Sequence, residues 1–163
     1  MAPGMLSRVC NIMKTILVAV DFSDVTLKVV KAAIHLAKPF QSRVILMHAT
    51  EIAPQLVSLS AGPDAIPLQP VEEEVTTEQF AESLKRLQEM VSAVGLESTT
   101  LSLRGPPVEL ILRQTETSRV DLIVLGSHGR GPLYHLFAGC VADGILKRAK
   151  CPVLIVPLHD QTT

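Results

Sequence analysis

The sequence predicts an α/β protein in which five parallel strands form a doubly wound sheet with helices on both faces. Short runs of Val, Ile and Leu alternate along the chain with longer segments whose apolar residues recur at helical spacing. Hydrophobic residues make up 47% of the chain and aromatic residues only 3%. The core must therefore be aliphatic, which suits strands buried on both faces. Strands that alternate with helices indicate right-handed crossovers between parallel strands.

The first half of the chain contains two predicted strands. They span residues 15–20 and 43–48, and each is a short apolar run. The helix between them is expected to start at Ser23, a residue type favoured at N-caps, and to stop at Pro39. Residues 51–72 carry four prolines and a glycine, which predicts a long loop of a length that is usually functional or mobile.

The next helix is predicted to open at Glu72–Glu74, where acidic side chains suit the helix dipole. Its apolar residues alternate in steps of four and three, and they form one predicted buried face: Phe80, Leu84, Leu87, Val91 and Val94. Gly95 suits the position just after the helix. A third strand then follows over residues 98–103.

The last third of the chain repeats the alternation. A helix follows Gly105, and residues 121–126 and 152–156 are the fourth and fifth predicted strands. The helix after Gly105 is expected to turn Val108, Ile111 and Leu112 inward. The helix between the last two strands is expected to bury one face, made of Val141, Ala142, Ile145, Leu146 and Ala149.

Composition excludes several classes of protein. A net charge of −1 and the scarcity of aromatic residues argue against nucleic-acid binding. No apolar run approaches the ~20 residues of a membrane span, and no signal peptide is visible, so we expect a cytoplasmic protein. The three cysteines form no C-x-x-C pair, which argues against a disulfide framework or a zinc site. We expect one domain over 13–158, a loose extension over 1–12 and a tail over 159–163.

Two strand ends carry the residues with binding chemistry. In open α/β sheets, ligands bind beyond the carboxyl ends of the strands, where the strand order reverses. Asp21 follows the first strand, and the glycine-marked run 126–131 follows the fourth. Glycines let an anion approach the backbone, and a helix starting near Gly139 would direct N–H groups at phosphate. The run lacks a P-loop lysine, so tight turns explain its glycines equally well.

Four segments of the chain closely resemble the universal stress protein family: 14–23, 121–131, 139–141 and 151–156. Three glycines match the family's nucleotide-binding spacing G-x2-G-x9-G, namely Gly126, Gly129 and Gly139. The resemblance covers residues 14–157. It implies the strand order 3-2-1-4-5, which sets the first and fourth strands side by side and brings Asp21 close to Gly126.

The resemblance also implies a ligand, which is ATP or another adenine nucleotide. Asp21 would lie near the adenosine, Ala19 would line the base pocket, and the backbone of Ala49 would contact adenine. Leu125 and Gly139 would also belong to the binding site. Ribose and phosphates would contact Gly126, Ser127, His128, Gly129, Arg130, Gly131, Cys140, Val141 and Ala142. Mg²⁺ or Mn²⁺ would be held through the phosphates. No side chain is expected to act catalytically, and His48 is interpreted as a packed residue with one hydrogen bond.

Cys140 departs from the family pattern, which has Ser or Thr at this position. A thiol is a weaker donor than a hydroxyl, so we expect weaker nucleotide binding rather than none. Its place at a helix start also suggests a hypothesis that Cys140 is sensitive to oxidation.

The resemblance implies a homodimer joined through the last strand, Pro152–Val156, because an apolar edge strand invites pairing. The predicted function is that of a nucleotide-binding sensor or switch in a stress response, with an unknown client protein. Two alternatives are a dimeric interaction module without nucleotide, which Cys140 favours, and a slow ATPase.

Overall fold

A computed structural model gives the fold, and it describes residues 13–50, 74–127 and 141–157. Of residues 74–79 it describes only the backbone. Four sequence-based predictions lie outside the described residues: the loose extension, the proline-rich loop, the tail, and the part of the glycine-marked segment over 128–140. Glu72 and Glu73, at the predicted start of a helix, also lie outside these ranges, and the other predicted helices and strands can be compared with the structure.

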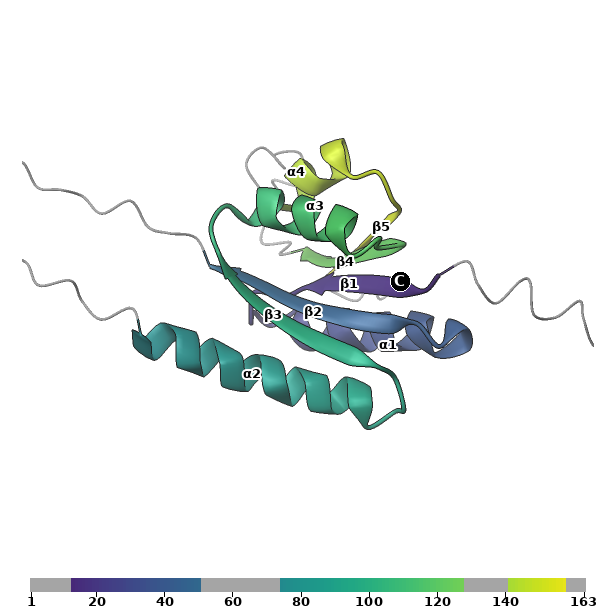
Figure 1. The fold of residues 1–163 in the computed structure, drawn as a ribbon, viewed down its shortest axis with the longest axis horizontal. Helices are drawn as coiled ribbons and strands as arrows, with labels where there is room; N and C mark the ends of the chain where they lie inside the picture. The colour runs from purple at the N-terminus through teal and green to yellow at the C-terminus, as the bar shows by residue number, and fades with distance from the viewer. Residues whose placement is uncertain (1–12, 51–73, 128–140, 158–163) are drawn as a thin grey trace, which may run out of the picture.

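The described chain forms one five-stranded sheet with helices on both faces (Figure 1). In chain order, the elements are β1 (Thr15–Ala19), α1 (Thr26–Phe40), β2 (Arg43–Thr50), α2 (Glu74–Ser92), β3 (Ser98–Arg104), α3 (Pro107–Thr117), β4 (Leu122–Ser127), α4 (Val141–Arg148) and β5 (Val153–Pro157). The strand order is β3-β2-β1-β4-β5 and every pairing is parallel. The predicted fold class and strand order are confirmed.

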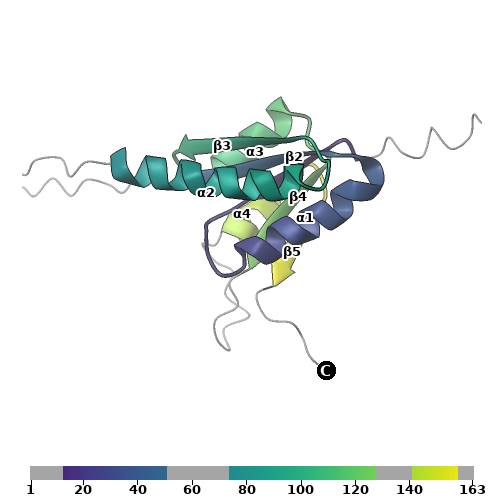
Figure 2. The same cartoon turned by 90° about the horizontal axis from the view of Figure 1, so that it is seen from below.

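The sheet lies between two layers of helices. Helices α1 and α2 cover one face, and α3 and α4 cover the other (Figure 1). The view from below shows α2 lying along β2 and β3, with α1 beside it (Figure 2). Within β1, Ile16 and Val18 pack toward α1 and α2, whereas Leu17 packs toward α3 and α4. Each central strand is thus buried on both faces, as its apolar run predicts.

The start of α1 differs from the prediction. The helix begins at Thr26, and its N-cap residue, Val25, makes no side-chain capping bond. Ser23 does not cap the helix by its side chain, because its hydroxyl bonds to Asp21 instead. At the other end, α1 runs through Pro39 to Phe40 and ends at Gln41, whose φ of 52° is left-handed.

Two residues predicted to be buried are exposed. Val94 is 37% exposed because α2 ends at Ser92, two residues before it, so the helical periodicity that predicts its burial does not reach Val94. Leu146 is 54% exposed because α4 turns Ala142 and Ile145 to the sheet and leaves Leu146 on its flank. Gly95 has a φ of 80°, which is the left-handed backbone expected just after a helix.

Candidate functional site

A cavity of about 240 Å³ lies at the carboxyl ends of the central strands. From β1 the chain builds the sheet outward through β2 and β3, then returns to place β4 and β5 on the other side of β1. The strand order therefore reverses between β1 and β4, which is where ligands bind in such sheets. The walls include these residues predicted from the sequence: Ala19, Asp21, Ala49, Leu125, Gly126, Val141 and Ala142.

The floor of the cavity is apolar. Ala19, Ala49 and Leu125 pack on the side of the sheet that faces α3 and α4. Met47 joins them because it lies two residues before Ala49 on β2 and so shares its face. Ile111 of α3 closes the cavity from above the sheet. A flat ring system suits such apolar walls.

Several lining residues were not predicted as site residues: Val20, Val25, Thr26, Val29, Met47, Pro107 and Ile111. A signal existed for Met47, because strand periodicity places it beside Ala49. The residues from α1 and α3 had no comparable signal, because helical periodicity alone does not say which turn of a helix reaches the strand ends.

Asp21 is exposed at the cavity and is bonded to the start of α1. Its Oδ1 accepts hydrogen bonds from the Ser23 backbone N–H at 3.1 Å and from the Ser23 hydroxyl at 2.6 Å. The Thr26 hydroxyl lies 3.4 Å from the same oxygen. An aspartate that bonds the backbone two residues ahead stabilises a turn. The carboxylate therefore has a fixed place at the site.

Gly126 is explained by helix packing. A Cβ at this position would lie 2.4 Å from Cγ1 of Val25 and 3.2 Å from Cγ2 of Val29, both on the α1 side of the cavity. Gly126 lies inside β4, and it is not among the described glycines with positive φ. The tight-turn interpretation is therefore wrong for this glycine, which instead lets α1 approach β4 closely.

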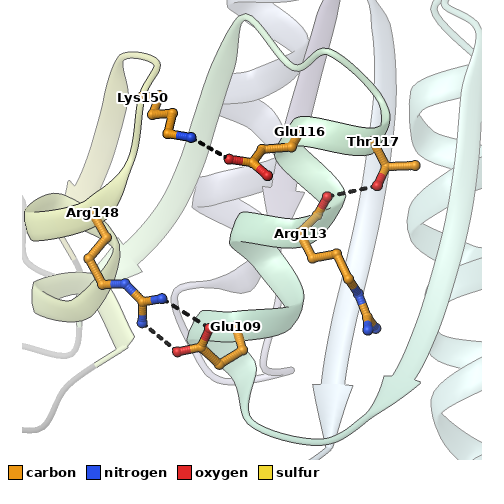
Figure 3. Close-up of polar contacts among 6 residues, drawn as sticks. All are labelled: Glu109, Arg113, Glu116, Thr117, Arg148 and Lys150. Carbon is orange, nitrogen blue, oxygen red and sulfur yellow. Dashed lines mark hydrogen bonds and ion pairs between the residues drawn. The ribbon is translucent and has the colours of Figure 1, made fainter.

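Helices α3 and α4, which both line the cavity, are linked by surface ion pairs and pack closely against each other. Arg148 makes two hydrogen bonds to Glu109, and Lys150 Nζ lies 2.7 Å from Glu116 Oε1 (Figure 3). The bond from Arg148 lowers the pKa of Glu109, and Lys150 lowers the pKa of Glu116 in the same way. These pairs are exposed and add little stability.

The helix contact itself is set by a glycine. A Cβ on Gly144 of α4 would lie 2.8 Å from Cγ2 of Val108 on α3. Because α3 and α4 both reach the cavity, this contact helps to fix the distance between two of its walls.

The remaining predicted residues divide into two groups. Ser127 is described as the half-buried last residue of β4, and it does not line the cavity. The others lie outside the described residues: His128, Gly129, Arg130, Gly131, Gly139 and Cys140. Within the described ranges, no three His, Cys, Asp or Glu side chains could hold a metal ion, and no helix is long and apolar enough to cross a membrane.

Comparison with known proteins gives the family. A sequence model of the Universal stress protein family matches residues 13–157. The chain belongs to this family. Universal stress protein MJ0531 of Methanocaldococcus jannaschii is 34% identical over 146 residues, which is 90% of this chain and 83% of that relative. Universal stress protein YxiE of Bacillus subtilis is 34% identical over 143 residues, which is 86% of this chain and 96% of the relative.

Solved structures of universal stress proteins share the fold. One in complex with cAMP has a TM-score of 0.68 at 20% sequence identity, and the match covers 90% of this chain and 98% of the chain in that structure. One from Archaeoglobus fulgidus in complex with dAMP has a TM-score of 0.62 at 22% identity, covering 88% of this chain and 98% of its own. At these identities, the likeness is one of fold.

Proposed function

We propose that this universal stress protein binds an adenine nucleotide at the carboxyl edge of its sheet and acts as a sensor or switch in a stress response. The observation that carries the proposal is the apolar cavity at the β1–β4 switch point, with the Asp21 carboxylate held at its wall. Two family members of the same fold form complexes with cAMP and dAMP, which supports an adenine nucleotide as the ligand.

The size and chemistry of the cavity fit a nucleobase. Its volume, about 240 Å³, is below the range of roughly 300–1,000 Å³ typical of pockets that enclose a whole ligand. One ring system would fill it and leave the ribose outside. The small side chains of Ala19 and Ala49 leave space for the flat base, while Asp21 can accept hydrogen bonds from ribose hydroxyls.

The phosphates are assigned from the sequence. Gly129, Gly131 and Gly139 would let backbone N–H groups approach the phosphate oxygens, with Mg²⁺ or Mn²⁺ held through the phosphates. Cys140 would replace a hydroxyl donor with a thiol, so binding would be weaker than in relatives with Ser or Thr. The same substitution is the observation that favours the second candidate, a dimeric interaction module that binds no nucleotide.

We also propose that two copies pair through β5. Among the described strands, β5 is hydrogen-bonded only to β4, so its other edge is open. Its residues Val153–Val156 are half-buried and apolar. An open apolar edge is a ready template for pairing with a second chain.

Whether the purified protein carries a bound nucleotide tests the proposal. The protein is purified without added nucleotide, denatured, and the supernatant is separated by chromatography with mass detection. Adenine nucleotide released in proportion to protein supports the proposal. If none is released, and ATP, ADP and AMP added at millimolar concentration also fail to bind in equilibrium dialysis, the interaction module is the better account.

A further inference from the structure

Three aromatic side chains gather beside the Asp21 segment, outside the lining of the cavity. Phe22 and Phe80 stack with ring centroids 5.3 Å apart and planes at 6°. The His48 ring packs against both, at centroid distances of 4.7 Å to Phe22 and 4.4 Å to Phe80. Phe22 follows β1, His48 lies on β2 and Phe80 lies on α2, so this aromatic cluster joins three separate elements.

His48 holds the residue before Asp21. The side chain is only 7% exposed, and its Nδ1 lies 2.8 Å from the carbonyl oxygen of Val20, which lines the cavity. Because a carbonyl only accepts, Nδ1 carries the proton. Over the described part of the chain, the buried Nε2 has no hydrogen-bond partner. A buried nitrogen without a hydrogen bond costs stability, and an apolar side chain would not carry that cost. What histidine contributes at this position is therefore the hydrogen bond to the Val20 carbonyl.

Phe22, the residue after Asp21, is held by contacts with other rings. Its φ is 58°, in the left-handed region that bulky side chains rarely adopt. Such strain persists only where surrounding contacts enforce it, and it gathers at functional sites. The contacts around Phe22 are the Phe80 and His48 rings, together with the hydrogen bond from the Ser23 N–H to Asp21 Oδ1, which closes a turn around Phe22. Asp21 is therefore fixed on both sides, through a hydrogen bond on one and a stacked ring on the other.

We propose that the aromatic cluster of Phe22, His48 and Phe80 is a positioning device that sets the Asp21 carboxylate for its ligand. For the ligand the inference rests on the proposed function, but the positioning itself does not. A consequence is that α2 is coupled to the nucleotide site, although it lies on the opposite face of the sheet from α3 and α4. A displacement of α2 near Phe80 would release Phe22 and lower nucleotide affinity.

The first arm of the test needs no nucleotide. Hydrogen exchange at the Ser23 amide, which bonds to Asp21 Oδ1, is measured by NMR in the free protein. Phe80→Leu keeps an apolar side chain but removes the stack, and we expect Ser23 exchange to become at least threefold faster. Leu87→Val, a buried change on α2 two turns away, is the control and should leave Ser23 unchanged. Unchanged exchange in Phe80→Leu would overturn the inference.

His48 offers a rescue experiment in the same assay. His48→Leu removes the donor to the Val20 carbonyl and should speed Ser23 exchange. His48→Asn keeps an N–H donor near the position of Nδ1 and should restore slow exchange. If Asn behaves like Leu, the hydrogen bond is not what positions the segment.

The second arm measures ATP affinity by calorimetry in a double-mutant cycle. Phe80→Leu should weaken ATP binding several-fold when Asp21 is present and leave it unchanged in an Asp21→Ala background. An equal loss in both backgrounds would show a general structural effect and would contradict the inference. If Ser23 exchange responds as expected but the unmodified protein binds no nucleotide, the positioning stands and the proposed function falls.

Discussion

Single residues set how closely the walls of the cavity approach one another. Gly126 admits Val25 and Val29 to the surface of β4, and Asp21 accepts hydrogen bonds from Ser23, just before α1. Both positions thus act on the same helix terminus. Contacts within the protein account for both residues, and they place the Asp21 carboxylate at the wall of the cavity.

Adding one methyl group at Gly126 tests this packing. Gly126→Ala would place a Cβ 2.4 Å from Val25 Cγ1, and we expect overpacking to lower the free energy of unfolding by about 1–3 kcal/mol. Val25→Ala in the same chain should recover much of that loss, because it removes the opposing methyl groups. Urea denaturation of the two single variants and the double variant gives the coupling. Additive effects would mean that the two side chains do not meet.

Cys140 offers a gain-of-binding test. Restoring the hydroxyl with Cys140→Ser should add a hydrogen bond worth about 1 kcal/mol, which is roughly a fivefold gain in ATP affinity. Cys151→Ser is the matched control, since this half-buried thiol precedes β5 and does not line the cavity. An unchanged Kd for Cys140→Ser would argue that residue 140 does not contact the phosphates.

At the scale of elements, α3 and α4 form two walls of the cavity, and the distance between them depends on Gly144. Replacing a glycine inside a helix with alanine normally stabilises a protein by roughly 1 kcal/mol. Here the new Cβ would lie 2.8 Å from Val108 Cγ2, so the two effects oppose each other. The outcome therefore distinguishes helix propensity from packing between helices.

We expect Gly144→Ala to give no such gain in the free energy of unfolding. In a Val108→Ala background, where the clash is removed, the same change should give about 1 kcal/mol. Thermal or urea denaturation of the four chains makes the comparison. A full gain in the unmodified background would show that α3 and α4 are not in tight contact at this point.

The helices and strands also show how much of the structure the sequence can predict. Strand periodicity and the alternation of strands with helices suffice for the parallel fold, and strand parity would have added Met47 to the site beside Ala49. Val94 was misplaced because periodicity does not say where α2 stops. The stack of Phe22 on Phe80 joins distant parts of the chain. The left-handed φ of Phe22 lies beside this stack and depends on tertiary contacts. No local pattern carries that information.

At the scale of the whole molecule, the open edge of β5 is the surface through which we propose that two copies pair. We expect light scattering at micromolar concentration to give the mass of a dimer. Ile155→Lys would set a charge in the apolar edge strand and should shift the protein to a monomer. Val94→Lys, an exposed apolar position that follows α2, is the control and should remain dimeric. A monomeric unmodified protein would rule out pairing through β5 at that concentration.

Nucleotide binding by the whole protein is the central claim, and a calorimetric titration with ATP tests it most directly. The unmodified chain should bind ATP at one site per subunit. Asp21→Asn keeps an oxygen that can accept from Ser23 but removes the charge, and we expect about a tenfold or greater loss of affinity, as for a bond to a charged acceptor. Glu97→Gln, which removes one charge just before β3, should bind like the unmodified chain. ATP binding that is absent, or equal in all three proteins, would contradict the account.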